Sequence, residues 1–203
     1  MTLSRGDAAV RLAAVTWSSA VAAAFCAWGA YDATPGPAAV GPPAPGVSAA
    51  EKPWRLTLYV HPHCPCSRAS LGAFAELVAS KPESIEAEVV FVRPAGSLAG
   101  WEAGELWDAA AKLPGACVRC DADGGEARRA GAATSGDAVL VDRDGRVAYR
   151  GGLTAGRGRS GDSPGRRAVR AALAGTDSPN ARGPVFGCPL FSPTACPTGA
   201  RDD

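Results

Sequence analysis

The residues best suited to chemistry stand together in one short segment, residues 61–66, with the sequence HPHCPC. It holds both histidines of the 203-residue chain and two of its seven cysteines. A cysteine thiolate is a nucleophile and a soft metal ligand, and an imidazole moves protons or binds metals near neutral pH. The segment therefore predicts one of two chemistries, thiol-disulfide exchange or the binding of a soft metal ion.

Cys64 is the predicted nucleophile. A run of β-forming residues precedes it and an amphipathic helical pattern follows it, so we expect Cys64 at the N-terminus of a helix. Unpaired backbone N–H groups and the helix dipole favour a thiolate at such a place. Cys66 follows after a single residue, and a disulfide across so short a spacer closes a small, strained ring. Such a pair is easily reduced and therefore oxidising, or the two thiolates instead share a metal ion.

His61 and His63 have a different role in each chemistry. In a redox protein they tune the thiolate or relay protons. At the end of a strand, positions 61 and 63 point to the same face, so both imidazoles can approach one ion beside the sulfurs of Cys64 and Cys66. That mixed set of nitrogen and sulfur ligands suits copper or zinc. Thiol-disulfide exchange by these residues requires no cofactor.

Cys188 lies in the segment 184–191, PVFGCPLF, well beyond the last predicted helix. The apolar residues around it predict that this segment packs back on the domain. We expect it to bring Cys188 toward Cys64 and Cys66, as a resolving thiol or as a third sulfur ligand. A disulfide to Cys196 is the alternative on spacing alone.

Cys117 and Cys120 have the spacing of a dithiol, but they lie at the end of a predicted strand without a helix N-terminus beside them. We interpret them as a structural or incidental pair rather than a second redox centre.

The elements that position these residues alternate along the chain. The order is strand, helix, strand, helix, strand, helix, strand, strand, helix, which favours a mainly parallel sheet covered by helices and ending in a hairpin. The hairpin turn is the sequence RDGR at 143–146, and Ser163-Pro164 predicts a capped helix start. The expected strands are 54–60, 86–92, 116–119, 138–142 and 147–151, and the expected helices are 67–80, 97–113, 125–130 and 163–175.

The N-terminal part predicts where the protein is located. Residues 12–31 carry no charge, and twenty helical residues are long enough to cross a bilayer. Arg5 and Arg11 precede this run, so the rest of the chain is expected outside the cytoplasm. The alternative is a signal peptide cleaved after residue 29, which would release a secreted protein. Residues 32–53, rich in Pro and Ala, are an expected linker.

The sequence thus divides into a cytoplasmic N-terminus (1–11), a transmembrane or signal segment (12–31), a linker (32–53), an α/β domain (54–191) and a C-terminal tail (192–203). The formal net charge of +1 gives no electrostatic reason to expect a nucleic-acid partner.

Four stretches carry a resemblance to a known group: HPHCPCSRAS at 61–70, EARRAGAATSG at 126–136, DRDGRVAYRGGLT at 142–154 and PVFGCPLF at 184–191. In these stretches the chain resembles the RedB-like group of bacterial thioredoxin-like envelope proteins. The resemblance implies a thioredoxin fold, a central mixed sheet flanked by helices, with reactive cysteines between the first strand and the first helix. It also places Cys188, rather than Cys196, at the site.

The chain departs from this group in two places. Residues 157–165 read RGRSGDSPG, without the His and Asn that the group carries in this loop. Residues 134–138, TSGDA, lack the cis-proline that shapes the docking groove of thioredoxins. The second departure makes a general thioredoxin-like reductase less expected.

Two functions follow from these patterns. The first is a thiol-disulfide oxidoreductase of the bacterial envelope, anchored in the cytoplasmic membrane by residues 12–31 and acting on protein thiols or disulfides. In it Cys64 attacks, Cys66 or Cys188 resolves, and the two histidines tune or relay protons. The second is a metal-binding or copper-delivery module that uses the same five residues as ligands, namely His61, His63, Cys64, Cys66 and Cys188.

Overall fold

The computed structural model describes residues 5–39, 54–176 and 181–191. The chain divides into two units, residues 1–34 and 35–203. The first unit contains one helix, α1 (Arg5–Ala33), and its span Gly6–Ala33 has a mean hydropathy of 1.5 with no buried residues. Length and composition make α1 a candidate for a membrane anchor or a signal sequence. It includes the predicted segment 12–31 and extends beyond it at both ends.

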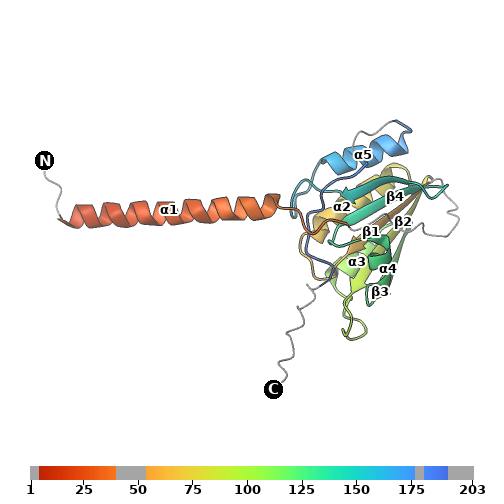
Figure 1. Ribbon diagram of the computed structural model, residues 1–203, viewed down its shortest axis with the longest axis horizontal. Helices are drawn as coiled ribbons and strands as arrows, with labels where there is room; N and C mark the ends of the chain where they lie inside the picture. Colours follow the sequence, from red (N-terminus) through yellow and green to blue (C-terminus); the bar gives the residue numbers. More distant parts are fainter. Residues whose placement is uncertain (1–4, 40–53, 177–180, 192–203) are drawn as a thin grey trace, which may run out of the picture. The chain divides into compact units, whose positions relative to one another are not determined.

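The second unit is built on a five-stranded mixed sheet with the order β3-β2-β1-β4-β5. Strand β1 pairs in parallel with β2, and β2 in parallel with β3, whereas β1–β4 and β4–β5 are antiparallel (Figure 1). The strands are β1 (Trp54–Val60), β2 (Ile85–Arg93), β3 (Ala116–Ala122), β4 (Asp137–Asp142) and β5 (Val147–Gly152). With the helices between them, this is the thioredoxin-like arrangement expected from the sequence.

Four helices cover the sheet: α2 (Ser67–Ser80), α3 (Glu105–Ala111) and α4 (Gly125–Ala130) connect successive strands, and α5 (Pro164–Leu173) follows β5. Alternate residues of each strand point to one face of the sheet, where they form the larger core with α2, α3 and α5. Its largest fully buried side chains include Leu56, Leu58, Phe74, Leu77, Phe91, Leu140 and Tyr149. This core fixes the end of β1 against the start of α2, where the cysteines lie.

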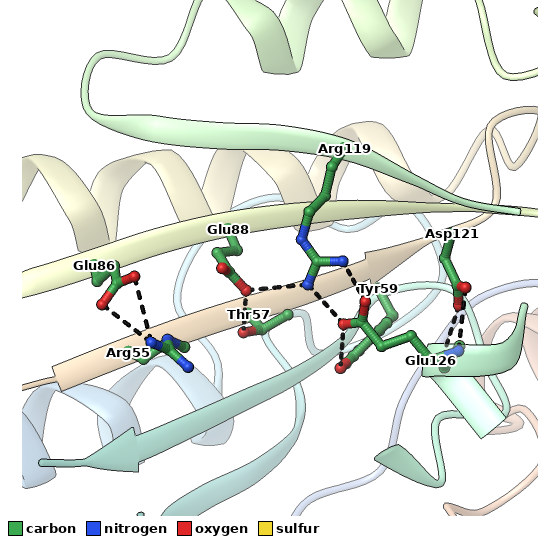
Figure 2. A network of polar contacts seen from close by, with 9 residues as sticks. Arg55, Thr57, Tyr59, Glu86, Glu88, Arg119, Asp121 and Glu126 are labelled. Atoms are coloured by element: carbon green, nitrogen blue, oxygen red, sulfur yellow. Dashed lines mark hydrogen bonds and ion pairs between the residues drawn. The ribbon is translucent and has the colours of Figure 1, made fainter. Parts of the chain in front are cut away.

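The opposite face of the sheet is covered differently. A small apolar cluster, including Tyr59, Val90, Val139 and Leu190, packs under α4. Next to it a row of polar side chains crosses β1, β2 and β3, as Figure 2 shows. Its contacts are Arg55–Glu86, Thr57–Glu88, Arg119–Glu88, Arg119–Glu126 and Tyr59–Glu126. Asp121 accepts the backbone N–H groups of Glu126 and Ala127 and so fixes the first turn of α4.

Most predicted elements are confirmed. The predicted start of α5 is also found, since Ser163 Oγ accepts the N–H of Arg166 at 3.1 Å and Pro164 is the first helical residue. The predicted helix 97–113 is confirmed only in part: α3 covers Glu105–Ala111, and the predicted start at Ser97 is wrong. Gly100 and Gly104 adopt φ values of 82° and 153°, which a right-handed helix excludes.

The expected linker 32–53 is described only in part. Its first two residues close α1, and residues 35–39 contact the domain, because Gly36 N donates to Val185 O at 2.8 Å and Thr134 Oγ1 donates to Pro37 O at 2.8 Å. Residues 40–53 and the predicted tail 192–203, with Cys196, lie outside the described residues.

Candidate functional site

The cysteine segment forms the turn that joins β1 to α2. Cys64 N donates to His61 O at 3.1 Å, and Ser67 N donates to Cys64 O at 3.1 Å. Cys66 occupies the position that caps the N-terminus of the 14-residue helix α2. Both sulfur-bearing residues therefore stand at the end of α2 where backbone N–H groups and the helix dipole stabilise negative charge.

Cys64 is almost completely buried, with 3% of its surface exposed. Its sulfur accepts the backbone N–H of Cys188 at 3.4 Å, and it also receives hydrogen bonds from the Ser67 hydroxyl, the Cys188 thiol and the Cys66 backbone. Burial raises the pKa of Cys64, but these four hydrogen bonds outweigh it and bring the pKa below its ordinary value. Cys64 therefore favours the thiolate form, which is the nucleophile in disulfide exchange.

Cys66 and Cys188 behave in the opposite way. Burial raises the pKa of the Cys66 thiol, and the negative charge of Cys64 raises it further. Burial, the hydrogen bond to Cys64 and the charge of Cys64 raise the pKa of Cys188 to about 12. The Arg157 guanidinium lowers the pKa of both thiols but does not reverse the shift. The site thus concentrates its negative charge on one sulfur and keeps protons on the other two.

The segment 181–191 is what brings Cys188 to this place. Ser135 N donates to Cys188 O at 2.8 Å, and Leu190 N donates to Ala133 O at 2.9 Å, so the segment lies antiparallel to residues 133–135. Val185, Phe186 and Leu190 are buried. Gly187 lies so close that a Cβ built on it would be 2.0 Å from Ser135 O. The segment is therefore a tightly fitted part of the domain.

Ser135 organises the backbone beneath the cysteines. Its hydroxyl accepts the N–H of His61 at 2.7 Å and lies 2.6 Å from Ser67 Oγ. Ser135 can donate to Ser67 while Ser67 donates to Cys64, which forms a continuous chain of hydrogen bonds from the end of β1 to the thiolate. Residues 134–138 are the stretch in which the sequence lacks a proline, and no cis peptide bond occurs in the described parts of the chain.

The two histidines gather around Trp101 rather than around the thiolate. The ring centroids of His61 and His63 lie 5.3 and 4.4 Å from that of Trp101, both edge to face. His63 Nε2 is 3.0 Å from Trp101 O, and His63 N donates to His61 Nδ1 at 3.2 Å. Burial and the charge of His63 lower the pKa of His61. The predicted roles of both histidines in tuning the thiolate or relaying protons remain predictions.

A surface hollow of about 260 Å³ borders Cys64. It is lined by residues 62–65 and by Arg68, Gly104, Glu105 and Leu106. Arg68 and Glu105 form an exposed ion pair, with 2.7 Å between Nη2 and Oε2. Its lining includes Cys64 and no residue of the segment 181–191.

The predicted metal ligands do not form a ready-made site. Within residues 5–39, 54–176 and 181–191, no three or more Cys, His, Asp and Glu side chains are arranged to hold a metal ion. The copper or zinc alternative for His61, His63, Cys64, Cys66 and Cys188 therefore stays a prediction.

The interpretation of Cys117 and Cys120 as a structural or incidental pair, rather than a second redox centre, stays a prediction. Both lie inside β3 as free thiols, not at its end, and residues three apart in a strand point to opposite faces of the sheet. The fold therefore does not bring the two sulfurs together, although the two residues have the spacing of a dithiol.

Three residues of the site were not predicted in these roles: Trp101, Ser135 and Arg157. Trp101 lies in a loop where the sequence predicts a helix, and Ser135 lies in residues 134–138, which contain no proline. Arg157 was visible only as one arginine of a glycine-rich loop. The absence of a proline from residues 134–138 was the one available signal near Ser135, and it did not single that residue out.

Comparison with known proteins adds to the fold assignment. No protein-family model matches the chain, and no curated protein matches its sequence. An uncharacterized conserved protein from Geobacillus kaustophilus aligns with a TM-score of 0.57 and 20% identity, over 71% of this chain and 80% of that one. A hypothetical protein from Sinorhizobium meliloti aligns with a TM-score of 0.57 and 24% identity, over 69% and 80%. These two proteins share the fold described above.

A third structure is a secreted Mycobacterium tuberculosis disulfide oxidoreductase. It aligns with a TM-score of 0.42 and 14% identity, over 61% of this chain and 81% of that one.

Proposed function

We propose that this chain is a thiol-disulfide oxidoreductase of the bacterial envelope, anchored in the cytoplasmic membrane by α1, with Cys64 as its nucleophile. One observation carries the proposal: the buried Cys64 sulfur at the N-terminus of α2 accepts the N–H of Cys188 at 3.4 Å. Hydrogen bonding at this sulfur brings the pKa of Cys64 below its ordinary value despite its burial. Such an environment stabilises a thiolate, and two further thiols, those of Cys66 and Cys188, lie within reach of it.

The reaction requires no cofactor. The Cys64 thiolate attacks one sulfur of a substrate disulfide, the substrate S–S bond breaks, and the first substrate thiolate leaves and takes a proton from water. Cys66 or Cys188 then attacks the Cys64 sulfur of the mixed disulfide and releases the second substrate thiol. The two protein cysteines lose two electrons and the substrate disulfide gains them. An envelope dithiol reductant returns the site to its reduced state, and the reverse sequence oxidises a substrate dithiol.

The location rests on the N-terminal unit and on the sequence resemblance. Arg5 and Arg11 precede the apolar run, which favours a cytoplasmic N-terminus and a domain on the outer side. The resemblance to the RedB-like group supports the same compartment, where protein thiols and disulfides are the expected partners. Cleavage after residue 29 would give a secreted protein with the same site.

The test is a redox titration of the full chain in detergent. The protein is equilibrated in glutathione buffers, alkylated, and each cysteine is read out by mass spectrometry. We expect a reversible two-electron couple at Cys64 with a potential between about −120 and −270 mV. Cys64→Ser should abolish it, and Cys117→Ser, which changes a thiol away from the site, should leave it unchanged. If Cys64 stays reduced in every buffer, the proposal fails.

A further inference from the structure

A hollow of about 330 Å³ lies between the end of β5, the start of α5 and the segment 181–191. Its lining includes no cysteine or histidine, so it is separate from the candidate thiol site. Pockets that bind small molecules have volumes of about 300–1,000 Å³. The hollow is therefore large enough for a small ligand and too small for an extended one.

Most of the wall of this hollow is apolar. The apolar lining residues are Tyr149, Ala155, Pro164, Pro184 and Phe186. The Tyr149 hydroxyl already donates to Gly152 O at 2.8 Å, so Tyr149 offers a ligand its ring rather than a hydrogen-bond donor. A wall of this kind binds an apolar or aromatic body, because contact removes apolar surface from water on both sides.

Two polar side chains interrupt the apolar wall, those of Thr154 and Arg182. Thr154 is only 5% exposed, and its hydroxyl makes no hydrogen bond within residues 5–39, 54–176 and 181–191. A buried hydroxyl without a partner costs free energy, and most buried polar groups in native proteins are satisfied by protein, water or a bound group. The Thr154 hydroxyl therefore indicates that something polar binds in the hollow.

Arg182 supplies an uncompensated positive charge. Its side chain is exposed and forms no ion pair with any residue that the structure describes. Arg182 also lines a neighbouring hollow that contains Asp137, but the Asp137 carboxylate is already paired with Arg150 at 3.0 Å. A single guanidinium matches a single carboxylate in charge and in bidentate geometry, whereas a phosphate carries more negative charge than one cation balances.

We propose that this hollow is a binding site for a small molecule that consists of an apolar body and one carboxylate. The carboxylate pairs with Arg182 and accepts a hydrogen bond from the Thr154 hydroxyl. The apolar body packs against Tyr149 and Phe186. The proposal is independent of the function proposed above, because it involves neither the cysteines nor their chemistry.

The ligand should also stabilise the segment 181–191, which forms one wall of the hollow and carries Cys188. A ligand that binds only while this segment is in place lowers the population of the opened segment by the factor 1 + [L]/Kd. Leu190 N donates to Ala133 O at 2.9 Å, and this N–H exchanges with solvent only when the segment opens. Hydrogen exchange in the segment therefore reports binding in the hollow.

The experiment measures hydrogen exchange of the full chain in detergent, read by mass spectrometry on peptides that cover 181–191. The probe is 3-phenylpropanoate, and its controls are 3-phenylpropanamide and 3-phenylpropylamine, which carry the same aromatic body without the negative charge. In the wild type we expect the carboxylate to slow exchange in a saturable way. The amide and the amine should need concentrations at least about tenfold higher for the same protection, since a hydrogen bond to a charged group is worth about that factor.

Two variants test the assigned contacts. Arg182→Gln should raise the concentration of 3-phenylpropanoate that gives half of the full protection by about tenfold, and Thr154→Val by about three- to tenfold. Thr154→Val should not lower the free energy of unfolding in urea, because the hydroxyl has no protein partner to lose; a structural role of this hydroxyl would give a loss. Arg143→Gln is the matched control, because Arg143 is an exposed arginine outside the lining of the hollow, and it should bind like the wild type.

Equal protection by the carboxylate, the amide and the amine would overturn the proposal, and so would no protection by 3-phenylpropanoate up to its solubility. These two results come from the wild type alone, so they stand even if a variant fails to fold. An Arg182→Gln protein that binds like Arg143→Gln would also overturn it. The redox couple of Cys64 is measured separately, so the failure of one proposal leaves the other unaffected.

Discussion

The backbone N–H of Cys188 donates to the sulfur of Cys64 at 3.4 Å, although 124 positions of sequence separate the two residues. This bond gives the segment 181–191 an electrostatic function, because it is one of the hydrogen bonds that offset the burial of the thiolate. The reactivity of Cys64 should therefore depend on residues near the start of the domain and on the segment 181–191.

The first prediction concerns the pH dependence of alkylation. Because its hydrogen bonds bring the pKa of Cys64 below the ordinary value of 9.0, its alkylation rate should reach half of its plateau below pH 9.0 and fall as the pH drops through that midpoint. The midpoint of Cys66 should lie higher, and that of Cys188 should lie near pH 12. Iodoacetamide labelling of the full chain, read by mass spectrometry, measures all three. A Cys64 midpoint at or above 9.0 would contradict the assignment.

Ser67 and Ser135 should have separable effects. Ser67→Ala removes a donor to the Cys64 sulfur, so the alkylation midpoint of Cys64 should rise. Ser135→Ala leaves the N–H of His61 without its acceptor, and it should lower the free energy of unfolding by about 1–3 kcal/mol. Urea unfolding and pH-dependent labelling measure the two effects. An unchanged midpoint in Ser67→Ala would rule out the hydrogen-bond chain as a source of thiolate stability.

Gly187→Ala tests the fit of the segment 181–191. The added Cβ would meet the backbone oxygen of Ser135 at 2.0 Å, so the segment must shift and the hydrogen bond from Cys188 to Cys64 must lengthen. We expect a loss of about 1–3 kcal/mol in unfolding free energy, measured in urea, and faster labelling of Cys188 at every pH.

Gly72→Ala is the control for this glycine substitution. Gly72 lies inside α2, and a Cβ there meets nothing within 4 Å. It should raise the unfolding free energy by about 0.5–1 kcal/mol, because alanine loses less backbone entropy in a helix. If both variants behaved alike, the close approach of Gly187 to Ser135 would be irrelevant to stability.

A buried ion pair joins Arg150 in β5 to Asp137 in β4. Both side chains are buried, with 3.0 Å between Arg150 Nη2 and Asp137 Oδ2, and Arg150 also donates to Ala130 O at 2.7 Å. Arg150→Met should cost about 3–5 kcal/mol of unfolding free energy at pH 7, because it leaves a buried carboxylate without its cation. A cost below about 1 kcal/mol would show that the pair is dispensable.

The cost of Arg150→Met should shrink as the pH falls. Burial already raises the pKa of Asp137 above its ordinary value, and losing the nearby cation raises it further. The native state then binds a proton that the unfolded state releases at the same pH, so stability increases toward acid. Urea unfolding at pH 5 and pH 7 measures the difference, and a larger cost at pH 5 would contradict it.

The location is tested by an arginine in the middle of α1. Val21→Arg adds a charge near the centre of the span Gly6–Ala33, where insertion costs about 2.5–3.5 kcal/mol. The wild type should stay with the membrane through an alkaline carbonate wash, and Val21→Arg should be partly extracted. Leu98→Arg, at an exposed apolar residue of the domain, is the control. A soluble wild-type product that begins near residue 30 would show cleavage instead of anchoring.

Much of the fold could be predicted from local patterns. Runs of β-branched and apolar residues identified β1 and β2, and Asp144-Gly145 identified the turn of the hairpin. The helix expected from Ser97 failed because three glycines with positive φ, at 96, 100 and 104, hold the chain in turns until α3 begins. Helical spacing of apolar residues could not reveal those backbone conformations.

Only those features of the site that depend on residues adjacent in sequence could be predicted. The position of Cys64 at a helix N-terminus follows from the strand before it and the helix after it. The contacts of Trp101, Ser135 and Arg157 come from three separate loops that the sheet brings together, and no pattern within one loop specifies them. The dithiol spacing of Cys117 and Cys120 was equally uninformative about contacts, since the conformation of β3 points their side chains to opposite faces of the sheet.

The bond between Cys188 and Cys64 also sets an order of events during biosynthesis. At about 5–20 residues per second, roughly 6 to 25 s pass between the synthesis of Cys64 and that of Cys188. Until then the nascent chain presents Cys64 without the segment that covers it, and an exported chain does so in an oxidising compartment. Newly made protein therefore passes through an interval in which the Cys64 sulfur is open to any disulfide it meets, and folding of the segment 181–191 ends that exposure.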